Sequence, residues 1–237
     1  LHERKIDATF FIPTDFLNNQ KMFYRHKASV LIDYLDRVDS KRYKNIAGAI
    51  LKEQKYNSND LQNSILTICY QKQNVLDMIA YGIDFSFNEY LNKYKPYMTS
   101  NHIRKLIDKG FTIGSHSRDH PYFQQLDLSS QLEQTRASIE FLLDQFSIDY
   151  KVFAIPFDDI GIKKEYFNKL YSDIGIDIYF GTAGMKSDQY ENNFQRFHLE
   201  NKYSNLNPSY VLKNKYSTAI FERIRKKNIL IRSNNGY

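Results

Sequence analysis

The sequence contains a single cysteine, Cys69, and no tryptophan among its 237 residues. One cysteine cannot form an internal disulfide, so the cysteine content says little about the compartment. Cys69 lies in the apolar-periodic stretch LQNSILTICY, and we expect it to be a core thiol. No run of residues is long and apolar enough to span a bilayer.

The sequence starts at Leu1, without a methionine and without a signal-peptide pattern. Such a start is typical of the middle of a gene product, so the sequence leaves the compartment open. At 237 residues, with 42% hydrophobic and 25% charged residues, the composition predicts a soluble globular chain. That length suits one large domain, or one domain with an insertion.

The charge balance is basic, with a formal net charge of +6 and a pI of about 9.1. Such a balance could favour nucleic acid, anionic lipid or acidic glycans. The basic residues are spread along the chain, however, and the densest cluster is the short run 223–227. We interpret this run as a solvated helix face and expect no nucleic-acid partner. The 19 tyrosines and 17 phenylalanines are interpreted first as compositional drift and second as a sugar-binding surface.

Short apolar runs alternate with helical patterns along most of the chain. The runs are too short for helices and read as buried strands at 8–13, 111–116, 152–157 and 177–184. Between them, HIRKLIDKG and KKEYFNKLYSDIG are helical patterns that end in glycine, and Ser130 with Glu133 resembles a capping box. Strands alternating with helices predict a parallel sheet or a β/α barrel. Residues 18 to about 98 show only helical periodicity, and we predict a mostly helical insertion there.

Two histidines follow the second predicted strand, in the stretch GFTIGSHSRDHPYF. Functional groups of parallel β/α folds gather at the carboxyl ends of strands, where His116 and His120 are expected. If the chain turns after His116, His120 can swing back to the same point, and Pro121 helps to hold that turn. Two neutral imidazoles suit Zn²⁺, Co²⁺, Ni²⁺ or Fe²⁺, with a carboxylate as the most plausible third ligand. The alternative is a pair of loop histidines that are satisfied by the backbone.

The order ATFFIP, then MTSNHIRKLIDKGFTIGSHSRDHP, then FAIPF resembles the polysaccharide deacetylases of the NodB-homology type, carbohydrate esterase family 4. The resemblance covers residues 1–17 and roughly 97–200. It implies an α/β fold, a distorted and incomplete (β/α) barrel, in a single domain over 1–237 with the helical insertion at about 18–98. It also implies a metal, most plausibly zinc with cobalt, nickel or iron as alternatives, held by His116 and His120.

The third ligand of the family belongs to an Asp-Asp motif on a strand that would precede residue 1, so the resemblance implies that the first strand and the catalytic base are not part of this sequence. We interpret this as amino-terminal truncation; loss during evolution is the alternative. Asp158 and Asp159 superficially read like the lost motif. Their place in the chain instead fits the family's third motif, and we expect them to begin the helix that continues through Lys164.

By the same resemblance, Pro156 and Phe157 form a substrate-binding turn. Ala154 stands where the family often has an arginine, and Arg196 is the candidate for a cation that orients a base; a surface salt bridge is the alternative. His198 is the histidine nearest to the family's late acid motif, but we assign it no role.

The function that the resemblance implies is metal-dependent removal of N- or O-acetyl groups from a polysaccharide or glycan. The alternatives are a catalytically inactive glycan-binding relative and a related metal hydrolase of a small amide. With two of three ligands and no base, we expect weak metal binding and negligible turnover from this chain alone. The sequence leaves the substrate, the general acid and the oligomeric state open.

Overall fold

The computed structural model describes residues 1–197 and 207–234, and the chain divides into two compact units. One unit combines Leu1–Thr14 with Ile103–Tyr237, and the other is Asp15–His102. We call them the sheet unit and the helical unit. His198 lies outside the described residues.

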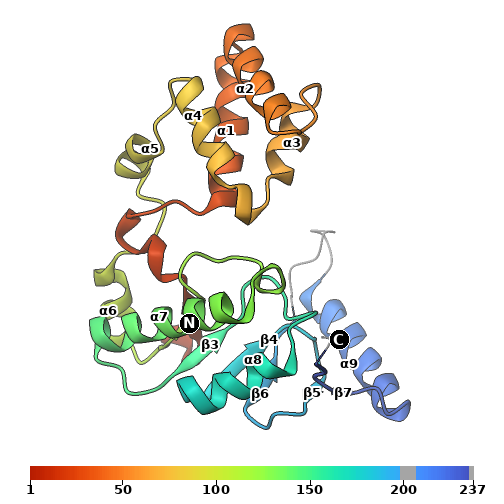
Figure 1. Ribbon diagram of the computed structural model, residues 1–237. Helices are drawn as coiled ribbons and strands as arrows, with labels where there is room; N and C mark the ends of the chain where they lie inside the picture. The colour runs from red at the N-terminus through yellow and green to blue at the C-terminus, as the bar shows by residue number, and fades with distance from the viewer. Residues whose placement is uncertain (198–206, 235–237) are drawn as a thin grey trace. The chain divides into compact units, whose positions relative to one another are not determined.

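A parallel sheet of five strands organises the sheet unit, in the order β1-β2-β3-β4-β6 (Figure 1). The strands are β1 Thr9–Ile12, β2 Thr112–Ser115, β3 Val152–Ala154, β4 Ile178–Gly181 and β6 Asn193–Gln195. The first four lie inside the four apolar runs, so those strand predictions are confirmed, as is a mixed α/β fold with a parallel sheet. A second, two-stranded parallel pairing joins β5 Ser187–Asp188 to β7 Ile229–Leu230.

Four α-helices accompany this sheet among the described residues: α6 Ser100–Asp108, α7 Leu128–Phe146, α8 Lys164–Lys169 and α9 Pro208–Ile224. The helical pattern KKEYFNKLYSDIG ends in glycine, as predicted. After α8, a single π turn, Leu170–Ile174, leads to Gly175, which has a φ of 67°. The predicted capping box at Ser130 is wrong. The side chain of Asp127 caps α7 by accepting a hydrogen bond from the backbone N–H of Ser130, at 2.7 Å. Single 3₁₀ turns occupy His2–Arg4, Tyr70–Lys72 and Phe123–Gln125, and Thr14–Asn19 is a 3₁₀ stretch kinked at Leu17 and Asn18.

The core of the sheet unit lies where α7 and α8 pack on β3 and β4. It consists of buried aromatic and aliphatic side chains: Phe123, Ile139, Phe153, Ile155, Ile162, Tyr166, Phe167, Leu170, Ile174, Ile176 and Tyr179. Burying side chains of this size supplies the main driving force for folding the unit. Their packing fixes the ends of the strands, where the histidines follow.

The helical unit contains α1 Tyr24–Val38, α2 Lys41–Glu53, α3 Leu61–Thr67, α4 Asn74–Gly82 and α5 Phe87–Tyr94. The predicted helical character of residues 18–98 is thus confirmed, while the description of this stretch as an insertion into one domain stays a prediction. Its core has buried side chains from α1 to α5. The side chains of Ser40, Asp60 and Ser86 cap α2, α3 and α5. Cys69 is half-buried, so the expectation of a core thiol is wrong.

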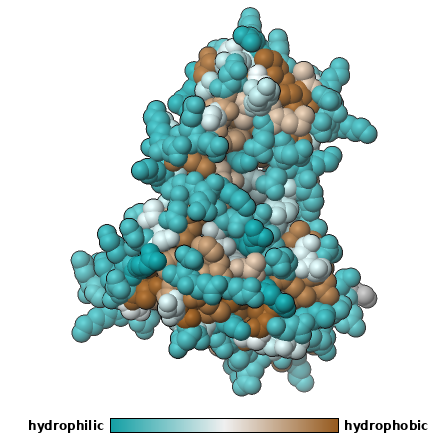
Figure 2. Space-filling model, turned by 60° about the vertical axis from the view of Figure 1, so that its left-hand side comes forward, coloured by the Kyte–Doolittle hydropathy of each residue, from teal (hydrophilic) through white to brown (hydrophobic). Residues whose placement is uncertain are grey.

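The face of the molecule drawn in Figure 2 is mostly covered by hydrophilic residues, with apolar residues exposed between them. This agrees with a mean hydropathy of −0.58 for the chain. No described helix combines the length and the apolar character that a membrane crossing requires.

Candidate functional site

The two histidines meet at the carboxyl end of β2. The centroids of the His116 and His120 rings are 4.7 Å apart, and the ring planes cross at 80°. His116 extends the β1–β2 pairing by one residue, since its backbone N–H donates to the carbonyl of Ile12 at 3.1 Å. Ser117 and His120 both have positive φ, 66° and 60°, which turns the chain back on itself. The rings therefore converge as the sequence predicts.

Side chains hold this turn in place. The backbone N–H of His120 donates to the hydroxyl of Ser117 at 3.0 Å. The amide oxygen of Gln134, on α7, accepts the N–H of Arg118 at 3.1 Å. The backbone of Ser117 also accepts the N–H of Thr14 at 3.2 Å, which ties the turn to the segment after β1. A loop with so many fixed backbone groups presents its histidines in one arrangement.

The tautomer of His116 follows from its partner. Its Nδ1 lies 2.6 Å from the carbonyl oxygen of Ala154, at the end of β3. A carbonyl oxygen only accepts, so Nδ1 carries the proton and Nε2 keeps its lone pair. Burial lowers the pKa of His116 to about 3, and the neighbouring His120 lowers it as well. Burial likewise lowers the pKa of His120 to about 4. Both imidazoles are therefore neutral at pH 7, which is the state that binds metal ions.

An aromatic pair stands beside His120. Phe157, at a φ of 57°, directs its ring toward His120, with centroids 4.6 Å apart. The ring of Tyr122 stacks on Phe157 at 3.7 Å with an interplanar angle of 6°. Pro156 is buried next to it and Phe157 is half-buried. The predicted proline-aromatic turn thus lies against the histidine pair.

Arg196 reaches the same region from the residue after β6. Its guanidinium donates to the carbonyls of Ile155, at 2.8 Å, and Gly181, at 3.2 Å, and lies 5.8 Å from the centroid of the Phe11 ring. Its positive charge contributes to the lowered pKa values of both histidines. These contacts are with backbone and ring atoms, so the alternative of a surface salt bridge does not describe them.

The two adjacent aspartates do not begin a helix, and that expectation is wrong. Helix α8 starts five residues after Asp159, with Lys163 at its cap position. Asp158 instead accepts the N–H of Ile160 at 3.1 Å, in a local turn. Asp159 is fully buried and forms an ion pair with Arg232 at 2.6 Å.

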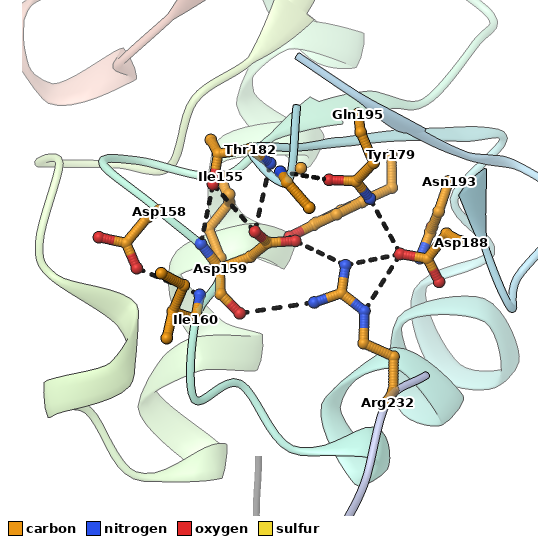
Figure 3. A network of polar contacts seen from close by, with 12 residues as sticks. Ile155, Asp158, Asp159, Ile160, Tyr179, Thr182, Asp188, Asn193, Gln195 and Arg232 are labelled. Atoms are coloured by element: carbon orange, nitrogen blue, oxygen red, sulfur yellow. Dashed lines mark hydrogen bonds and ion pairs between the residues drawn. The ribbon is translucent and has the colours of Figure 1, made fainter. Parts of the chain in front are cut away.

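Figure 3 shows the network around this ion pair. The same nitrogen of Arg232 lies 2.6 Å from a carboxylate oxygen of Asp188, so one guanidinium joins two carboxylates. The other carboxylate oxygen of Asp159 accepts the N–H and the hydroxyl of Thr182 at 3.2 and 2.9 Å. Gln195 donates to Asp188 at 2.9 Å. Asp159 is thereby committed to Arg232 and Thr182 rather than to the histidines.

Sequence reasoning missed Arg232 and Asp188. Arg232 lies 73 residues from Asp159 and 44 from Asp188 in the chain. No spacing rule links residues so far apart. In the described part of the chain, no group of three or more His, Cys, Asp or Glu side chains is placed to hold a metal ion.

Comparison with known proteins gives one match, to the family model described as polysaccharide deacetylase, over residues 66–178. Neither the curated proteins nor the solved structures gave a match. The matched stretch contains both histidines and the Pro156–Phe157 turn, whereas β1 and Arg196 lie outside it. The match begins within the helical unit, at α3, and ends at the first residue of β4. The resemblance predicted from the histidine motif is thus confirmed: residues 66–178 match the family model described as polysaccharide deacetylase.

Proposed function

We propose that this chain carries the metal-binding histidines and the substrate turn of a metal-dependent hydrolase that removes N- or O-acetyl groups from a polysaccharide or glycan. The family implies deacetylation of glycans by hydrolysis of C–N bonds. The observation that supports metal dependence is the convergence of two neutral imidazoles, 4.7 Å apart, at the carboxyl end of a parallel sheet. The proposal includes the incomplete (β/α) barrel as a single deacetylase-like domain, into which the helical unit is inserted as a segment with a core of its own.

The two histidines suit a divalent transition metal, but they supply only part of the donor set that such an ion needs. His116 keeps its Nε2 lone pair because Nδ1 is fixed on the Ala154 carbonyl, an arrangement common among metal-binding histidines. His116 and His120 would hold the ion, with Zn²⁺ favoured and Co²⁺, Ni²⁺ and Fe²⁺ as further candidates. A third protein donor is absent from the described residues. When bound, such an ion supplies a Lewis acid for the acetyl carbonyl.

The other side chains have positioning roles in this proposal. Arg196 places a fixed positive charge beside the histidines, suited to orienting a carboxylate base or a developing negative charge. Phe157 and Tyr122 offer a stacked aromatic surface of the kind that packs against the apolar face of a sugar ring. The general acid is not assigned.

A catalytically inactive glycan-binding relative is the second candidate. It is favoured by the absence of a third donor among the described residues, because the aromatic surface would bind a sugar without one. A metal hydrolase that acts on a small amide would use the same histidines. Binding of acetylated oligosaccharides compared with small amides separates the glycan-directed candidates from the small-amide hydrolase. The metal titration described next separates a metal-dependent site from a glycan-binding relative without one.

The first test is a titration of the chain with Co²⁺, followed by visible absorbance. We expect a dissociation constant weaker than micromolar, because two imidazoles are fewer donors than catalytic sites use. His116→Asn and His120→Asn should each weaken binding by at least about tenfold, the loss that follows even from removing an outer partner of a ligand. His102→Asn is the matched control, since His102 is exposed and bonded to Thr99 near the start of α6.

Equal loss in the His102 variant, or no loss in the other two, would contradict the metal assignment. We also expect negligible acetate release from this chain alone, because no carboxylate in the described residues joins the histidines as a base would. Zinc binding in the micromolar range or tighter, together with normal deacetylation, would overturn that expectation.

A further inference from the structure

Helix α9 packs against the rest of the protein along a narrow strip. It spans 17 residues, and Val211 is its one buried residue in the part of the chain that the structure describes. Leu212, Ala219 and Glu222 are half-buried on the same side. The helix lies at the margin of the sheet unit (Figure 1). Helices in proteins gain most of their stability from packing an apolar face, yet the packed strip of α9 is short.

The larger apolar surface of α9 faces away from this strip. Its five side chains are Tyr210, Tyr216, Ile220, Phe221 and Ile224, each between 53% and 72% exposed. With about 100° between successive helical residues, these positions fall within an arc of about 140°, opposite Val211. We call this surface the α9 face. Ile229 and Ile231, which follow the helix, are exposed by 56% and 68% and extend the apolar surface.

Positive charge accompanies the α9 face. Six exposed cations lie on the helix or directly after it: Lys213, Lys215, Arg223, Arg225, Lys226 and Lys227. The sole carboxylate between residues 207 and 234 is Glu222, which is half-buried and lies 3.8 Å from the ammonium of Lys186. The exposed surface is thus both apolar and cationic.

We propose that the α9 face binds an anionic lipid surface, lying parallel to it at the interface. Lys213 and Ser217 lie among the apolar side chains of this arc, so the surface offers both apolar area and positive charge, the two contributions by which a helix binds an anionic lipid interface. A second copy of the chain would bring these cations against one another, which charge repulsion opposes. Nucleic acid would neutralise the cations but leave Ile220, Phe221 and Ile224 in water. The interpretation of 223–227 as a merely solvated face does not account for these apolar side chains.

The test is co-sedimentation of the full chain with vesicles of pure phosphatidylcholine or of phosphatidylcholine with phosphatidylglycerol. We expect binding to the anionic vesicles, weakened by raising the salt concentration, and little binding to the neutral ones. The double substitution Ile220→Glu with Ile224→Glu should reduce binding at least tenfold. The matched control is Met78→Glu with Tyr81→Glu on α4, where both side chains are exposed. Both pairs lower the net charge of +6 by two, so the change in charge is the same in the two variants.

A second variant, Lys226→Gln with Lys227→Gln, leaves every apolar side chain in place. Each removed cation should weaken binding about fivefold, since a Lys or Arg near an anionic surface contributes about 1 kcal/mol. The proposal is overturned by absent binding to anionic vesicles, or by equal binding of the α4 and α9 pairs. It is also overturned if light scattering shows a dimer that the α9 pair dissociates, or if binding to duplex DNA alone is seen. None of these outcomes depends on the proposed deacetylase function.

Discussion

At the scale of single residues, Arg232 is a buried cation that the sequence analysis did not identify. It is 2% exposed, and its guanidinium lies between Asp159 and Asp188 and over the ring of Phe167 at 4.2 Å. Asp159 lies two residues after Phe157, so this network also holds the end of the aromatic turn beside the histidines. Removing the guanidinium would leave two buried carboxylates without a counter-charge. Removing the carboxylates would leave a buried guanidinium in the same state.

We expect Arg232→Met to lower the free energy of unfolding of the sheet unit by about 3–5 kcal/mol, the usual cost of removing one partner from a buried ion pair. Urea unfolding followed by circular dichroism measures this change. Lys169→Met is the matched control in the same unit. Lys169 pairs with Asp173 one turn away at 3.7 Å, and the two side chains are exposed by 40% and 41%. Its loss should change stability by about 0.5 kcal/mol or less. Similar costs for the two variants would mean that the Arg232 network is solvated.

The pairs His116–His120 and Asp159–Arg232 differ in how far apart their members lie in the sequence, and this distance decides whether the pairing can be predicted. The histidines are four residues apart and follow a strand, so a turn alone can bring them together. Arg232 and Asp159 are 73 residues apart, and their pairing depends on where β7 and the turn after β3 are packed. The assignment of Asp158 and Asp159 to a helix start was wrong for the same reason, because burial beside a distant cation took precedence over local capping.

At the scale of elements, β2 approaches its neighbours more closely than a side chain would permit. A Cβ atom on Gly114 would lie 2.6 Å from the Phe11 ring on β1 and 3.2 Å from the carbonyl of Val152 on β3. Phe11 in turn packs on Phe180 of β4, with ring centroids 5.3 Å apart. Glycine at this position thus allows three strands and their rings to pack directly behind His116.

We expect Gly114→Ala to cost about 1–3 kcal/mol in free energy of unfolding, since the Phe11 ring must shift in a packed interior. Thermal unfolding by calorimetry measures the loss. Gly48→Ala provides the comparison, because Gly48 lies within α2 and the nearest atoms to an added Cβ are 3.6 Å away. That substitution should raise stability by up to about 1 kcal/mol, from the helix propensity of alanine. A neutral Gly114 variant would show that the strands can separate without cost.

Elements were predictable from the sequence where their apolar pattern was long enough. The first four strands lie in apolar runs, and the five helices of the helical unit lie in periodic stretches. The strands β5, β6 and β7 have two or three residues each, among them Ser187, Asp188, Asn193 and Gln195. Such strands are defined by backbone pairing with distant partners and carry no periodicity of their own.

At the scale of the whole molecule, each unit has a core of its own. The buried cluster of the helical unit draws on residues from Met22 to Leu91, all within Asp15–His102. The cluster of the sheet unit draws on residues from Phe123 to Tyr179. A compact unit with a separate hydrophobic core meets the physical requirement for folding alone. The family match spans parts of both units, from residue 66 to residue 178.

We therefore expect residues 15–102, produced alone, to fold into a helical domain with one cooperative unfolding transition. The caps on α2, α3 and α5 and the core around Leu31, Leu76 and Ile79 are all retained in this segment. Circular dichroism during urea unfolding measures the transition. The substitution Leu76→Ala should lower its stability by about 2–5 kcal/mol, because Leu76 is fully buried. Tyr81→Ala, at an 89% exposed position on the same helix, should leave the transition nearly unchanged. A gradual loss of helix with no response to Leu76→Ala would show instead that this segment depends on the sheet unit, as an insertion without independent stability would.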